Sequence, residues 1–419
     1  MRGMRRLVLL AVLVLAVGAG PAPAAVLGEQ RVLIVLATWG PEPYSQATAR
    51  AALDEAAAYM RSVSFGRTWI VGEVTPWLRP LTARPACELQ RISDAALAAA
   101  RALGYDTARY TTLGIAVPRI DCFWTGAYFP PGIWMNGEMN RHLIAHELGH
   151  TYGVSEEGPA WVCTPGCHSE PYGNPFSVMG HGLSDFGAWE KVEFGWIDRA
   201  RVAVAERAGS FRLGAIDRPS GDPYALRVFA GGDEYWFEYR SPSPLWAYGA
   251  PEASPGLVVY GGSNGLGEAG RFPGRNYVIA DPVRRGRPSV RTGETFAVPG
   301  AFAVTVASTR AEGVDLRFRW ADRARPAPPR ALRSLRRGRR LLVRWRRGAE
   351  RGSGIAAHEI SVDGRRPTRV AAARSAAGFL VRNDDRATLQ VPSGRHRLSV
   401  VAVDRAGNRS RPARLIVRS

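Results

Sequence analysis

The motif that most restricts the fold of this chain lies in residues 141–150, which read RHLIAHELGH. Its core is H-E-x-x-H, formed by His146, Glu147 and His150. On an α-helix, residues four apart lie on one face, so both imidazoles can reach one metal ion while Glu147 points toward water at that ion. The motif predicts a helix over residues 138–152 that carries a zinc site. An ordinary surface helix is the alternative.

Four further stretches lie before and after this motif. The full set is SFGR at 64–67, HELGHTYG at 146–153, YGNPFSVMG at 172–180, FGAWEKVEFGWID at 186–198 and EYWFEYR at 234–240. Together these stretches resemble the gametolysin-type metzincin peptidases, with a weaker likeness to the immune inhibitor A peptidases. The likeness covers roughly residues 30–320 and implies a zinc metallopeptidase.

The resemblance also implies a third zinc ligand and a supporting methionine. In the family, a glycine three residues after the second histidine ends the helix, and the third ligand follows three residues later. Gly153 and Glu156 occupy these positions, and we expect Glu156 to bind zinc because carboxylates are zinc ligands. Met179 would form a Met-turn beneath the ligands, although a methionine that only fills the core is the alternative. Three nearby residues are rivals of Glu156: Glu157, His168 and His181.

Strand and helix patterns alternate before the zinc motif, and short β segments follow it. The early patterns are apolar runs of strand length at 31–38, 68–78 and 112–118, and helical periodicities at 46–61 and 88–103. We therefore expect an α+β metzincin-like fold with a mixed sheet, helices and the zinc helix, followed by β structure. The expected parts are a signal peptide at 1–24, the catalytic domain at 25–200, a β-rich domain at 201–320, a Pro/Arg-rich linker at 321–330 and a fibronectin type III or Ig-like β-sandwich at 331–419.

The N-terminus and the cysteines predict a secreted protein. Arginines at 2, 5 and 6 precede an apolar run at 7–17 and the small residues at 22–24, which is typical of a secretory signal peptide. The mature chain has no apolar stretch of the about twenty residues that span a membrane. Four cysteines favour two disulfides, and a Cys-rich zinc site is the alternative. Of three possible connectivities, the spacing suggests the pairs Cys87–Cys122 and Cys163–Cys167.

Positive charge is concentrated at the C-terminal end. Arginine greatly exceeds Asp and Glu over residues 321–419, which carry most of the formal net charge of +19. Such a domain could hold an anionic cell-surface polymer through many weak contacts. Since Lys191 is the only lysine, a general bias toward arginine explains part of the excess, and a solvated basic spacer is the alternative.

The sequence thus favours a secreted, monomeric zinc endopeptidase that acts on proteins or peptides. Glu147 would be the general base, and Tyr172 or His181 could assist the oxyanion. In metzincins an edge strand at a place equivalent to residues 126–138 lies beside the substrate; a buried aromatic loop is the other interpretation. The alternative function is a catalytically weak surface or matrix-binding protein that acts through its basic C-terminal module.

Overall fold

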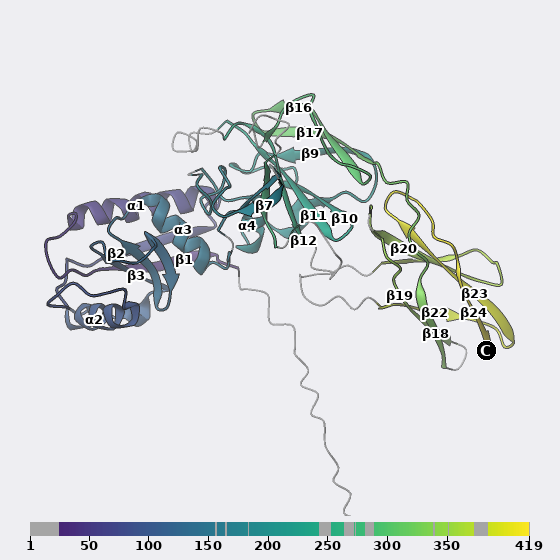
Figure 1. Ribbon diagram of the computed structural model, residues 1–419, viewed down its shortest axis with the longest axis horizontal. Helices are drawn as coiled ribbons and strands as arrows, with labels where there is room; N and C mark the ends of the chain where they lie inside the picture. The colour runs from purple at the N-terminus through teal and green to yellow at the C-terminus, as the bar shows by residue number, and fades with distance from the viewer. Residues whose placement is uncertain are drawn as a thin grey trace, which may run out of the picture.

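The computed structural model describes residues 25–418, apart from residues 156, 164–165, 183, 243–252, 264–271, 273, 281–288, 338–339, 351 and 373–383. The expected signal peptide at 1–24 and the expected ligand Glu156 therefore lie outside the described residues. Figure 1 shows three regions that follow one another along the chain: a helix-containing N-terminal region, a central β region and a C-terminal β region.

A five-stranded sheet forms the centre of the N-terminal region. Its order is β2-β1-β3-β5-β4, in which β4 alone pairs antiparallel and lies at the edge. The strands are β1 (Gly28–Leu36), β2 (Thr68–Val74), β3 (Thr112–Val117), β4 (Gly126–Phe129) and β5 (Gly132–Asn136). Three helices cover the sheet: α1 (Gln46–Val63), α2 (Leu89–Ala102) and α3 (Arg141–Thr151).

The side chains of β1 explain why helices lie on both faces of this sheet. Val32, Ile34 and Leu36 share a core with α1 and α3, whereas Leu33 and Val35 share a second core with α2. A strand buried on both faces reads as a continuous apolar run, since successive side chains point to opposite faces. The helices thus form two layers around the sheet, and α3 lies on the same side as α1.

Two further sheets pack together in the central region. The larger has the order β7-β6-β13-β12-β11-β10-β8, with β14 paired to β12, and the smaller has the order β15-β16-β17-β9. Their inner faces share one core that includes Tyr235, Phe237, Phe302 and Phe318. The strands of the larger sheet are β6 (Ala160–Cys163), β7 (Cys167–Glu170), β8 (Val202–Val204), β10 (Ala225–Ala230), β11 (Asp233–Arg240), β12 (Gly256–Ser263), β13 (Tyr277–Ala280) and β14 (Ser289–Val290). Those of the smaller sheet are β9 (Gly209–Gly214), β15 (Thr295–Val298), β16 (Phe302–Arg310) and β17 (Gly313–Trp320).

The larger sheet runs across residue 200, where we expected a domain boundary. Strands β6 and β7 directly follow the zinc-motif helix, yet β6 pairs in parallel with β13. The short helix α4 (Ala188–Glu193) lies between β7 and β13 in the chain. The segment after α3 is therefore fixed at one end by its own helix and at the other by the central sheet.

Two smaller sheets form the C-terminal region. Their orders are β18-β19-β22 and β21-β20-β23-β24, and residues of both, such as Trp345, Ile360 and Val400, share one core. The strands are β18 (Arg330–Arg337), β19 (Arg340–Arg346), β20 (Ile355–Val362), β21 (Thr368–Ala371), β22 (Asp384–Gln390), β23 (Arg395–Asp404) and β24 (Ala413–Arg418). The Pro/Arg-rich segment before β18 contacts this region, because Asp322 accepts hydrogen bonds from the backbone and hydroxyl of Ser353.

The expectation of an α+β metzincin-like fold is wrong for this chain. The described residues form twenty-four strands in five sheets and only four α-helices, so the chain is mainly β. The helical periodicity that suggested an α+β class is real, but in the described part of the chain the six-residue α4 is the only α-helix after α3. Both expected disulfides, Cys87–Cys122 and Cys163–Cys167, are present. Within the described residues, no helix combines the length and apolar character needed to cross a bilayer.

Candidate metal centre

The two histidines of the motif lie one turn apart on α3. Asn140 begins this helix, since its side chain accepts a hydrogen bond from the backbone N–H of Leu143 at 2.9 Å. The Nε2 atoms of His146 and His150 are 3.2 Å apart, and Oε2 of Glu157 lies 3.1 Å from the first and 3.4 Å from the second. The helix and the loop after it therefore bring three ligand atoms to one point.

Hydrogen bonds on the far side of each ring fix how the imidazoles face this point. Nδ1 of His146 lies 2.9 Å from the carbonyl oxygen of Val178, and Nδ1 of His150 lies 2.7 Å from that of Val154. A carbonyl only accepts, so each Nδ1 carries a proton, and in its neutral form each ring then directs an Nε2 lone pair at the cluster. Two lone pairs and a carboxylate oxygen then face one another, which is the donor set of a metal ion such as Zn²⁺.

The structure separates the candidates for the third ligand. Glu157 joins the two histidines, whereas His168 and His181 are exposed and do not belong to the cluster. His181 instead contacts the carbonyl oxygen of Tyr172 through Nδ1 at 2.7 Å. Glu156, the first choice from sequence, lies outside the described residues.

Two glycines on or near the helix allow this arrangement. Gly153 has φ of +108°, a conformation that glycine adopts at low cost, and the chain turns back there toward Glu157. A Cβ on Gly149 would overlap Sδ of Met179, which is fully buried beneath the helix. Met179 thus packs against the turn of helix between the two histidines, and it offers no atom to the three-residue ligand cluster.

A cleft of about 460 Å³ opens over the cluster. Its walls include both histidines, Glu147, Glu157 and Tyr172, together with the edge strand β4. The Tyr172 ring stacks on that of His146, with centroids 5.9 Å apart. Gly126 lets Glu147 approach β4 closely, since a Cβ there would overlap the Glu147 carboxylate. The four aromatic residues that also line the cleft are Phe123, Trp124, Tyr128 and Phe129.

The two carboxylates of the cleft have opposite pKa shifts. Burial raises the pKa of Glu147 to about 7, and the neighbouring histidines only partly oppose this shift. Burial also disfavours the charged form of Glu157, but hydrogen bonds from His146 and His150 outweigh it and lower its pKa to about 2. Burial raises the pKa of Tyr172 to about 12, so its phenol keeps its proton and can donate it. Glu157 is therefore the anionic member of the cleft.

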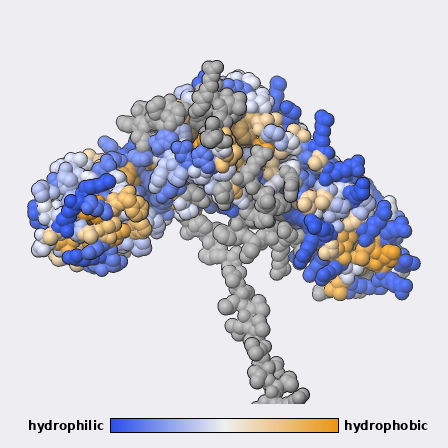
Figure 2. Space-filling model, viewed as in Figure 1, coloured by the Kyte–Doolittle hydropathy of each residue, from blue (hydrophilic) through white to orange (hydrophobic). Residues whose placement is uncertain are grey.

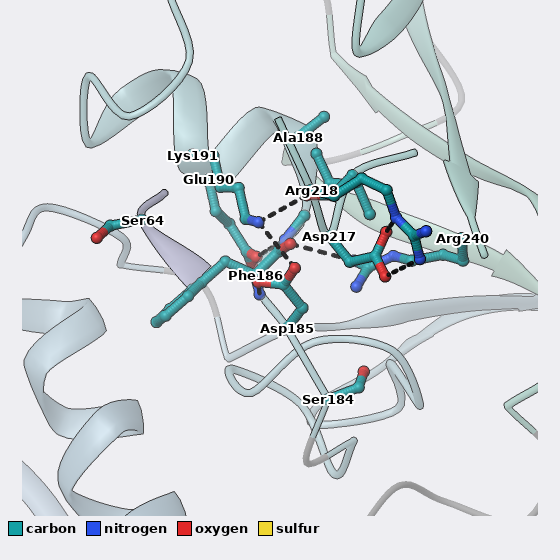
Figure 3. Close-up of polar contacts among 12 residues, drawn as sticks. Ser64, Ser184, Asp185, Phe186, Ala188, Glu190, Lys191, Asp217, Arg218 and Arg240 are labelled. Atoms are coloured by element: carbon teal, nitrogen blue, oxygen red, sulfur yellow. Dashed lines mark hydrogen bonds and ion pairs between the residues drawn. The ribbon is translucent and has the colours of Figure 1, made fainter. Parts of the chain in front are cut away.

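Asp185, Glu190, Lys191 and Arg240 belong to a buried polar network near the zinc-motif helix (Figure 3). Ser177 donates to Glu190 at 3.0 Å, and the hydroxyl of Ser177 in turn accepts the backbone N–H of Met179 at 3.1 Å. Arg240 on β11 pairs with Glu238 at 2.6 Å and donates to the carbonyl oxygen of Phe176 at 3.3 Å. The central sheet thus holds the segment whose Val178 carbonyl orients His146.

The only lysine of the chain belongs to the same network. Lys191 is fully buried, and its Nζ lies 2.7 Å from Oδ2 of Asp185 and 2.8 Å from the carbonyl oxygen of Ile216. Its Nζ also lies over the Phe65 ring, 4.6 Å from the centroid. Burial lowers the pKa of Lys191 and raises that of Asp185. The sequence analysis missed this network, whose one signal was charge at alternate positions of the apolar segment EYWFEYR.

Comparisons with known proteins add little to this description. No family model matches the chain, and no characterised protein matches its sequence. The spore cortex lytic enzyme SleM of Clostridium perfringens is 16% identical, with 28% of this chain and 38% of that chain covered and a TM-score of 0.19. Domains d3-d4 of the rat CD45 extracellular region are 11% identical, with 31% and 70% covered and a TM-score of 0.19.

The glycoside hydrolase domain of Endo-D from Streptococcus pneumoniae is also 11% identical, with 52% of this chain and 30% of that chain covered and a TM-score of 0.18. The chain therefore spans well under half the length of both the lytic enzyme and the Endo-D domain. TM-scores at this level carry no argument about fold or function.

Proposed function

We propose that the protein is a secreted zinc-dependent endopeptidase of the gametolysin type that its motifs resemble. The observation that carries the proposal is the convergence of one ligand atom each from His146, His150 and Glu157, with the Nδ1 atoms of both rings bonded to backbone carbonyl oxygens. These three residues would hold the metal. Bound Zn²⁺ supplies Lewis acidity, which makes water more acidic and polarises the scissile carbonyl.

The other residues of the cleft have roles that follow from their positions. Glu147 lies next to the first ligand and lines the cleft, so it takes a proton from the attacking water and passes it to the leaving amine. Tyr172 also lines the cleft and can donate its phenolic hydrogen to the developing oxyanion, whereas His181 is not among the lining residues.

The edge strand β4 suggests how a peptide would bind. It pairs on one side with β5 and has no second partner strand among the described residues. An extended peptide can add to such an edge through main-chain hydrogen bonds, which are independent of the substrate's side chains. An unstructured protein is therefore the expected substrate.

The experiment measures zinc content and casein cleavage together. We expect about one zinc ion per chain in the purified mature protein. Glu147→Gln should reduce cleavage by about 10²–10⁴-fold and leave the zinc content unchanged, because this residue moves a proton and does not bind the metal. A metal-free active protein, or full activity in this variant, would refute the proposal.

Variants of the adjacent residues Glu156 and Glu157 test which of the two is the third zinc ligand. Glu157→Gln should lower zinc affinity by at least about tenfold, whereas Glu156→Gln should leave it unchanged. The reverse result would restore Glu156 as the ligand. Zinc binding without any cleavage would instead favour the alternative of a catalytically weak matrix-binding protein.

A further inference from the structure

The sheet β18-β19-β22 presents an arginine-rich face to solvent. Leu341, Val343 and Trp345 of β19 point into the core of the C-terminal region, so the residues between them point outward. Among the outward residues, Arg340 and Arg344 are exposed. Figure 2 shows strongly hydrophilic side chains bordering this region.

The register of the three strands places arginines directly opposite one another. Arg344 on β19 pairs with Arg333 on β18 and with Arg386 on β22, and all three are exposed. These three residues form what we call the arginine row. Neighbouring strands lie about 4.8 Å apart, so the backbone positions that carry three positive charges follow one another at that spacing. Like charges directly opposite across a sheet oppose folding, which means that an anion on this face would relieve an existing repulsion.

Some exposed arginines elsewhere in the described structure have carboxylate partners, for example Arg50 with Asp54 and Arg212 with Asp315. By contrast, the described residues provide no ion pair to any member of the arginine row. Asp384 stands in register with the neighbouring Arg346 and not with the row. The charge of the row is therefore available to an external anion.

We propose that the arginine row is a binding surface for a linear phosphate polymer that lacks bases. The guanidinium group is a planar fork that binds phosphate through two parallel hydrogen bonds. A closely spaced row requires a polymer of high linear charge density, and a polysaccharide with one carboxylate on every second sugar would leave members of the row unpaired. The described residues on this face include no exposed aromatic ring on which a base could stack, which disfavours single-stranded nucleic acid.

The test compares two triple variants of the full mature chain. One changes the row, with Arg333→Gln, Arg344→Gln and Arg386→Gln, and the control changes three exposed arginines elsewhere, Arg109, Arg207 and Arg317, to glutamine. Both variants lose the same net charge, so a difference between them reports position alone. Binding of fluorescent long-chain polyphosphate is measured by anisotropy over a range of salt concentrations.

We expect the row variant to bind polyphosphate at least about tenfold more weakly, and its slope of log affinity against log salt should fall by about 2. The control should change affinity by less than about twofold, and the row variant should melt no lower than the parent because it loses like-charge contacts. Equal weakening of both variants would overturn the proposal, as would tighter binding of hyaluronan or of single-stranded DNA than of polyphosphate.

Discussion

Two clusters of charged and polar side chains contact the segment around Met179, and they differ in how their atoms are paired. In the buried network, Lys191 contacts Asp185, and Arg240 contacts Glu238, so each cation has an anion within 2.7 Å. In the cleft, His146 and His150 in their neutral form present only acceptors to each other and to Glu157. The comparison separates the two roles: the cluster that lacks paired charges is the candidate ligand site, whereas the cluster whose cations are paired has a structural role.

The two clusters are also connected through a short segment. Ser177 bonds to Glu190 in the buried network, and the next residue, Val178, accepts the Nδ1 hydrogen of His146. Arg240 and Glu238 come from β11 in the central sheet. The N-terminal region therefore provides the candidate metal ligands, while the central region holds the backbone that orients one of them.

The largest expected effect comes from unbalancing the buried network. Lys191→Ala should lower the free energy of unfolding by about 3–5 kcal/mol, because it leaves the Asp185 carboxylate buried without its cation. The measurement is guanidinium-induced unfolding. The double variant Lys191→Met with Asp185→Leu removes both charges and should recover most of that loss. A single-variant cost below about 1 kcal/mol would contradict the structural role.

Removing the Glu157 charge from the cleft should affect stability differently from removing the Lys191 charge. In metal-free protein at alkaline pH, where imidazoles are neutral, Glu157→Gln should not lower stability, since it takes away one of three mutually repelling acceptors. Saturation of the parent with zinc at 100 times its Kd should add about 2.7 kcal/mol to the free energy of unfolding. The same zinc concentration should stabilise the variant far less. Strong destabilisation of the metal-free variant would show that the cleft cluster is structural after all.

The packing of Gly149 against Met179 gives a smaller effect. Gly149→Ala should lower the free energy of unfolding by about 1–3 kcal/mol, because the added methyl group overlaps the buried Met179 side chain, which must shift. Gly40→Ala is a suitable control, since a Cβ there meets no atom within 4 Å. Thermal unfolding of both variants tests this prediction, and equal melting temperatures would argue against close packing at Gly149.

The smallest effect concerns pH and extends the comparison to the C-terminal region. Burial disfavours the charged form of Asp385, but hydrogen bonds from His358 and Arg347 outweigh it and hold its pKa at about 2, below the ordinary value of 3.8. The folded state therefore binds this proton more weakly than the unfolded state does. The resulting stability is present above about pH 4 and is lost as pH falls toward about 2. Asp385→Asn should flatten this part of the melting-temperature profile, and an unchanged profile would exclude the contribution.

Asp404 provides the contrasting case in the same region. It lies with Asp322 and Glu350 in a group of three buried carboxylates, and burial raises its pKa. The folded state then binds the proton more tightly, so the contribution of Asp404 to stability grows as pH falls. Asp404→Asn should consequently abolish a gain in stability as pH falls, whereas Asp385→Asn abolishes a loss of stability as pH falls.

Local patterns predicted the helices well. The periodicity over 46–61 corresponds to α1 at Gln46–Val63, and the expected zinc helix over 138–152 corresponds to α3 at Arg141–Thr151, which Asn140 caps. Helical periodicity depends on residues within a few turns of one another, so sequence is sufficient to find it. The paired histidines follow from that helix alone.

Long-range pairing could not be predicted in the same way. Nothing local indicates that β6 at Ala160–Cys163 pairs with β13 at Tyr277–Ala280, and this pairing joins the segment after α3 to the central sheet. The α+β class was wrong because the many short strands after α3 outweigh the helices before it. Glu157 was only a rival candidate because it follows the turn at Gly153, where no periodicity tells which of two adjacent glutamates faces the histidines.

The burial of the only lysine has a consequence for the outer surface. Lys191 is fully enclosed, so arginine supplies all of the exposed permanent cations in the described chain. A guanidinium group keeps its proton at any pH the protein meets, and it is not a substrate for lysine acetylation. The positive charge that arginine places on the surface is therefore insensitive to acidification and to acyl-transfer enzymes, and amine-directed reagents would label only the α-amino terminus of the folded protein.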